Sequence, residues 1–173
     1  NNPVTTAEDI SITGSIGSYT FNAINQESAQ NLASRVGAKS ELTGVQASAK
    51  TEALLVSSNA NEESIRLLVN DAATQSFNFS STNFAAAIKA INALTDITGV
   101  TAESDSGGIR LKHTQGSDIT IENMESSTSL SVRKIAANGR DYVGGAVALQ
   151  ASGNNDSTRV TGALMLSSSE SFG

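Results

Sequence analysis

One unit occurs twice in this chain, and the duplication constrains the fold more than any other feature. The first copy opens with the strand-like segment 19–23 and ends at a Thr-Gly-Val triplet at 43–45. The second opens at 76–79 and ends at the same triplet at 98–100, 55 positions later. In each copy a helical stretch lies between, and an alternating apolar and polar run follows. Repetition at a fixed spacing indicates a repeated structural unit.

Bulk composition excludes several classes of function. The 173 residues suffice for one substantial domain or two small ones. Aromatic residues make up only 4% and Trp is absent, which predicts a thin core of Ile, Leu, Val and Ala rather than a large enzyme with a deep cleft. The net charge of −6 argues against binding to nucleic acid. No apolar run approaches the roughly 20 residues of a membrane span.

Periodicity predicts the elements of the first copy. A strand containing Ile10 and Ile12 should lead through a Gly-rich turn into a strand at 19–23. A helix should follow, capped by Asn25 or Ser28 and ended by Gly37. Its apolar positions recur at helical spacing: Ala29, Leu32, Ala33 and Val36. The remaining predicted strands are 45–49, 53–57 and 64–70.

The segment 61–71, which contains the predicted strand 64–70, is locally ambiguous, because its spacing also satisfies a short helix. Its counterpart in the second copy, 118–122, alternates as a clear strand. Since the repeat constrains more than local propensity does, we predict a strand.

The second copy and the remainder are interpreted in the same way. We predict a helix over 83–94 and a hairpin turn at 105–108. The predicted strands of the second copy are 76–80, 99–104, 108–113 and 118–122. Those of the last block are 130–135, 143–150 and 159–166, with a turn at Asn138-Gly139 and a polar loop at 152–156.

These elements predict an α+β chain. Each of two repeats should be one helix packed on its own small antiparallel sheet, followed by an all-β C-terminal segment. The predicted domains are 1–72, the first repeat with its leading strand; 73–126, the second repeat; and 127–173, the β segment.

No residue pattern indicates catalysis, a cofactor or a metal site. Cys is absent and His113 is the only His, which leaves no Cys/His nucleophile and no zinc site. His113 should be a surface or rim residue at a strand end. Loose carboxylate clusters could perform acid–base work or hold calcium, but they match no calcium loop. They are interpreted as solvated faces and turn ends: Glu103, Asp105, Asp118, Glu122 and Glu125.

Two weaker patterns carry little weight. Gly144-Gly145 is followed by no Gly-Lys-Ser/Thr and so does not predict a phosphate loop. Asn78 and Asn155 fit the N-glycosylation acceptor pattern, which is frequent by chance in an Asn- and Ser-rich chain.

The duplicated pattern resembles the repeated insertion motif of bacterial flagellins and hook-associated proteins. Both copies carry it, with Phe21 before the triplet at 43–45 and Phe79 before the triplet at 98–100. The C-terminal stretch 160–172 is similar to the strand by which the variable outer part of a flagellin returns to its helical core.

The resemblance implies a structural protein, not an enzyme: the surface-exposed outer domain of a flagellin, the filament subunit used in motility. It implies secretion through the flagellar export channel, and contact with other flagellin subunits through a helical core that this sequence lacks. The chain, which begins without Met, is expected to be a fragment and to be monomeric on its own. Surface Ser and Thr are candidate O-glycan sites.

Two other functions are alternatives to this structural role. A carbohydrate- or host-binding adhesin or tail-fibre module would need an aromatic face, such as Tyr142, beside a groove with polar groups. A secreted hydrolase would need a pocket that brings together Asp118, Glu122 and His113.

Overall fold

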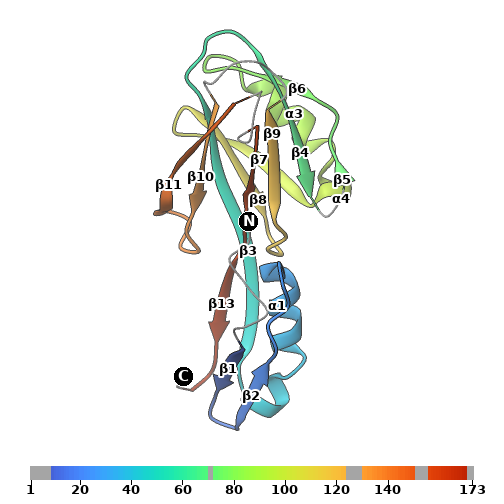
Figure 1. Cartoon of the computed structure of the whole chain (residues 1–173), viewed down its shortest axis with the longest axis vertical. Helices are drawn as coiled ribbons and strands as arrows, with labels where there is room; N and C mark the ends of the chain where they lie inside the picture. Colours follow the sequence, from blue (N-terminus) through green and yellow to red (C-terminus); the bar gives the residue numbers. More distant parts are fainter. Residues whose placement is uncertain (1–8, 70–71, 124–129, 151–155, 171–173) are drawn as a thin grey trace.

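The computed structural model describes residues 9–69, 72–123, 130–150 and 156–170. The molecule is elongated (Figure 1), with a narrow lower lobe and a wider upper body. The lower lobe consists of β1 (Ile10–Thr13), β2 (Ser18–Phe21), α1 (Ala29–Gly37), α2 (Ser40–Thr43), the first half of β3 (Gln46–Ser57) and β13 (Ala163–Ser167). The upper body contains the second half of β3, β4 (Glu63–Val69), β5 (Ala72–Ala73), β6 (Phe77–Phe79), α3 (Ala85–Asn92), α4 (Thr95–Thr98), β7 (Val100–Asp105), β8 (Gly108–His113), β9 (Ile119–Asn123), β10 (Leu130–Ile135), β11 (Tyr142–Leu149) and β12 (Ser157–Val160).

Strand β3 connects the two parts. Its first half, Gln46–Lys50, pairs with β13 in the lower lobe, and its second half pairs with β8 and β10 in the upper body. The prediction of two separate strands at 45–49 and 53–57 is therefore wrong. No Gly or Pro interrupts residues 46–57, so a single extended segment of 12 residues can run through both parts.

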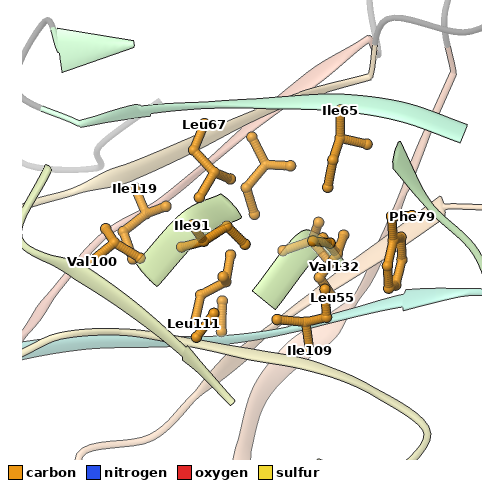
Figure 2. Close-up of a cluster of buried hydrophobic side chains, with 14 of the residues drawn as sticks. Leu55, Ile65, Leu67, Phe79, Ile91, Val100, Ile109, Leu111, Ile119 and Val132 are labelled. Atoms are coloured by element: carbon orange, nitrogen blue, oxygen red, sulfur yellow. The ribbon is translucent and has the colours of Figure 1, made fainter. Parts of the chain in front are cut away.

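The core of the upper body lies between two antiparallel sheets. One has the order β11-β10-β3-β8-β7, with β13 added on β3, and the other has the order β12-β9-β4-β5, with β6 added on β4. Figure 2 shows side chains from both sheets meeting those of α3. The largest fully buried side chains include Leu55, Ile65, Leu67, Phe79, Ile91, Ile109, Leu111, Ile119 and Ile121. Aliphatic residues thus build this core, as the composition predicts.

The predicted α+β fold class is wrong. In the described residues thirteen strands accompany four short helices, and the chain is mostly β with three sheets. The two predicted repeats do not form separate sheets, because β3 of the first repeat lies in the same sheet as β7 and β8 of the second repeat. Strands β10, β12 and β13 of the last segment also pair into these sheets. Helices of 8 or 9 residues are too short to cover a sheet alone, so sheet packs on sheet instead. The boundaries at 72/73 and 126/127 remain predictions.

A shorter unit does recur. In both copies a short strand with a buried Phe leads to a helix, a four-residue helix and a left-handed Gly, with φ of 75° at Gly44 and 70° at Gly99. The Thr43 hydroxyl donates to the Lys39 carbonyl (3.2 Å) and accepts from the Val45 N–H (3.1 Å). Thr98 does the same with Leu94 (3.0 Å) and Val100 (3.2 Å). The two Phe side chains nevertheless belong to different clusters, Phe21 in the lower lobe and Phe79 in the upper body.

The Thr-Gly-Val triplet is thus a turn with a physical reason for each residue. The Thr side chain satisfies backbone groups at the helix end, and Gly adopts a positive φ that a Cβ would disfavour. The Val that follows is fully buried in both copies.

Several predicted elements agree with the structure. Ser28 caps α1 by accepting from the Asn31 N–H, and β4 shows that 64–69 is extended. The turn at 105–108 is present, with positive φ at Ser106 and Gly107. Asn70, most of the loop 152–156 and Phe172 lie outside the described residues.

The helix predicted over 83–94 is confirmed as α3, and the short helix α4 that follows it was not predicted. One strand needs correction. The strand predicted over 159–166 is two strands in different sheets, β12 and β13, which separate at Gly162. A Cβ at Gly162 would lie 2.5 Å from the Gly116 carbonyl oxygen, so the close approach of two chain segments requires Gly here.

Candidate functional site

The predicted carboxylates that the structure describes pair with three different arginines. Asp118 accepts from Arg159 Nε (2.8 Å) and from the Gly162 N–H (3.3 Å), and Glu122 accepts from Arg66 across the neighbouring strand. Asp118 is only 6% exposed, so its interpretation as a solvated turn residue is wrong. Glu103 and Asp105 flank Arg110 at the solvent side of β7. Glu125 lies outside the described residues.

His113 is buried, and its prediction as a surface or rim residue is wrong. Its Nδ1 accepts from the backbone N–H groups of Gln115 and Ser117 (3.3 Å each), and its ring packs against Gly99. Burial lowers the pKa of His113 below its ordinary 6.5. The neutral ring therefore holds the β8–β9 loop. This stabilisation is fully present above the unfolded-state pKa of 6.5 and is lost as the pH falls through the lowered folded-state pKa, because protonation removes the acceptor.

The contact between Gly99 and His113 makes a measurable prediction. Gly99→Ala should lower the free energy of unfolding by about 2 kcal/mol, because it adds overlap with the His113 ring to a backbone strain of about 1–2 kcal/mol. Urea unfolding followed by circular dichroism measures the change. Gly107 is the matched control: it has a similar φ of 77° but no atom near the added Cβ, so Gly107→Ala should cost about 1 kcal/mol. Equal losses in the two variants would contradict the steric role of His113.

A buried ion network that the sequence reasoning missed joins three parts of the upper body. Glu52, on β3, is 3% exposed. It accepts from Arg110 on β8 and from Lys50 Nζ (3.0 Å). The Arg110 guanidinium also donates to the Gly139 carbonyl in the β10–β11 turn (2.7 Å). The one signal of this network in the sequence is a Glu directly before the apolar run 53–56.

Tyr142 and one surface hollow bear on the rival adhesin function. Tyr142 is exposed and lies under the Arg133 guanidinium, 4.7 Å from ring centroid to Cζ, but it lines none of the hollows described here. A hollow of about 250 Å³ in the lower lobe is lined by Tyr19 and Phe21. Lys39 and Arg35 lie over these two rings, at 4.9 Å and 5.6 Å. The cations thus cover the aromatic faces on which a sugar would stack.

The structure also places the Gly pair and the Asn-x-Ser acceptor sites that the sequence analysis considered. Gly144 and Gly145 lie on the edge strand β11. The Asn78 side chain donates to Glu62 at an exposed position (3.0 Å), and Asn155 lies outside the described residues. Within the described ranges no group of three or more His, Asp or Glu side chains is placed to hold a metal ion. None of the helices described is long and apolar enough to cross a membrane.

Both ends of the described chain lie in the lower lobe. Asp9 accepts from the Ala23 N–H (3.3 Å), next to β2. At the other end, the Ser168 hydroxyl donates to the Gly44 carbonyl (3.0 Å). Ile10 and Leu166 pack against the same apolar cluster of Ile12, Phe21, Val36 and Val45. The upper body therefore extends away from the lobe that contains the first and the last described residues (Figure 1).

Comparison with protein-family models and with curated proteins finds no match for this chain.

Proposed function

We propose that this chain is the surface-exposed outer domain of a flagellin, with a structural role in the flagellar filament. The observation that carries the proposal is that the first and the last described segments, at Asp9 and at Ser168, both lie in the lower lobe. A domain with this arrangement can be inserted into a longer chain, and its upper body then projects from the insertion point.

The repeated turn supports the same proposal. The insertion motif that the sequence resembles depends on the Thr-Gly-Val triplets, and both triplets make the same hydrogen bonds. The residues that a hydrolase would need have other partners: Asp118 binds Arg159, and Glu122 binds Arg66.

This proposed role implies which partners the protein contacts and what properties its surface needs. Neighbouring subunits would be contacted through a helical core outside this sequence, and export would occur through the flagellar channel. The acidic surface, with a net charge of −6, favours solubility where many copies are held close together. O-glycans on surface Ser and Thr are testable by the intact mass of native filaments.

Immunogold labelling of cells of the source organism tests the proposal. Antibodies raised against the folded chain should label flagellar filaments along their whole length, because every subunit would display the domain. Antibodies against a periplasmic protein would serve as the negative control. Label on the cell body, or on another appendage with bare flagella, would refute the proposal.

A further inference from the structure

An apolar cavity lies where the lower lobe meets the upper body. Its volume is about 250 Å³. Apolar side chains of β1, α1 and β13 line it, chiefly Ile10, Leu32 and Leu164, and Lys134 enters from β10. An apolar pocket with one or two polar groups is the usual form of a small-molecule site.

Lys134 is a partly buried cation whose hydrogen-bond partners are neutral. Its Nζ donates to the Thr161 hydroxyl (3.1 Å) and the Gly162 carbonyl (3.5 Å), both neutral. In the described part of the chain no carboxylate lies within 4.0 Å of it, whereas five other cations have such a partner: Arg35, Lys50, Arg66, Arg110 and Arg159. Burial lowers the pKa of Lys134, an effect that the charge of Asp118 opposes.

The one carboxylate of the cavity lining does not supply the missing charge. Glu27 pairs with Arg35 at 2.7 Å, on the lower-lobe side. An ammonium carries three N–H donors, and the two neutral acceptors of Lys134 occupy two of them without supplying a negative charge. A hydrogen bond from an ammonium to a carboxylate is stronger than one to a neutral acceptor.

We propose that this cavity binds a small monocarboxylate with a short unbranched apolar chain. The carboxylate pairs with Lys134 Nζ, and the chain packs among Ile10, Leu32 and Leu164. An apolar cavity of about 150 Å³ holds benzene, so a somewhat larger one suits roughly 4–8 carbon atoms. This inference is independent of the proposed filament role.

Titration of the full chain with hexanoate, followed by heteronuclear NMR, tests the proposal. Saturable shifts should appear at Ile10, Leu32 and Leu164, and affinity should rise about fourfold for each methylene from butyrate to hexanoate. Hexan-1-ol and hexylamine have the same chain without the carboxylate and should bind at least tenfold more weakly. Equal binding of the three compounds, or no saturable shift with hexanoate, would overturn the inference.

Two variants locate the site. Lys134→Met should weaken hexanoate binding at least tenfold, while Lys112→Met, which removes a cation on β8, should change it less than twofold. Leu164→Phe keeps the charge but fills the cavity and should also abolish binding, which provides a second test if Lys134→Met does not fold. Hexanoate affinity that is unchanged in either cavity variant would refute the assignment.

Discussion

Phe79→Ala is expected to lower the free energy of unfolding by about 3–5 kcal/mol, since it removes a large side chain from a packed core. Phe79 is fully buried in the main cluster between the two sheets. It lies on β6 and belongs to the same buried cluster as Leu55 and Ile109 of the opposite sheet (Figure 2). The cavity left by truncation cannot close easily, because strands of both sheets surround it.

Equilibrium unfolding in urea, followed by circular dichroism, measures this loss. Ile97→Ala provides the control: Ile97 is a large aliphatic residue of the same repeat, but it is 69% exposed, so its change should lie within about 0.5 kcal/mol. Phe21→Ala should act on the separate lower-lobe cluster. Its effect should therefore appear in hydrogen exchange of β1, β2 and α1. A loss below 1 kcal/mol for Phe79→Ala would contradict the two-sheet core.

Glu52→Gln is the second substitution with a large expected effect. It preserves shape but leaves Arg110 and Lys50 without their shared buried carboxylate. Removing one member of a buried ion pair typically costs 3–5 kcal/mol. Since Arg110 retains the Gly139 carbonyl and Asp105, we expect about 3 kcal/mol at pH 7.

The pH dependence gives a further check. Burial by itself raises the pKa of the Glu52 carboxyl, but the hydrogen bonds and charges of Arg110 and Lys50 outweigh it, so that its pKa lies below the ordinary 4.5. A lowered folded-state pKa means that the carboxylate stabilises the fold above pH 4.5 and that this contribution is lost as the pH falls through the folded-state value. The difference between wild type and Glu52→Gln should therefore shrink in acid.

Glu103→Gln is the matched control for Glu52→Gln. Glu103 approaches the same Arg110 at 3.9 Å, but its side chain is 68% exposed. Its change should cost less than about 1 kcal/mol. Equal costs for the two variants, or a pH-independent cost for Glu52→Gln, would show that the buried network does not stabilise the fold as described.

Local features were predictable from the sequence, and their physical reasons are local. Alternation located most strands, and β8 occurs at the predicted residues 108–113. Helical spacing and a cap residue located α1. The comparison of the two copies resolved 64–70, which periodicity alone left ambiguous. Alternation, helical spacing and the cap residue each depend on side chains within a few residues of one another, and the comparison of the copies adds a second instance of the same local pattern.

The errors share a different cause. The sequence predicts two strands where the structure has the single strand β3, and one strand where it has β12 and β13. The reason is that the partners of a strand cannot be identified from the segment itself. His113 and Asp118 were placed at the surface because a polar side chain at a strand end is usually exposed. In the structure both satisfy backbone N–H groups at the junction of the lobe and body: Gln115, Ser117 and Gly162.

The sequence by itself determined the repeated Thr-Gly-Val pattern, a helix before each triplet, and an aliphatic core with few aromatic residues. These follow from backbone conformational preference and side-chain size. Only the tertiary structure decided that the strands of the two copies share sheets, that Glu52 and His113 are buried, and that Lys134 lines a cavity. An apolar strand face requires burial but does not specify which strand will cover it. That choice is made by contacts between residues far apart in the chain.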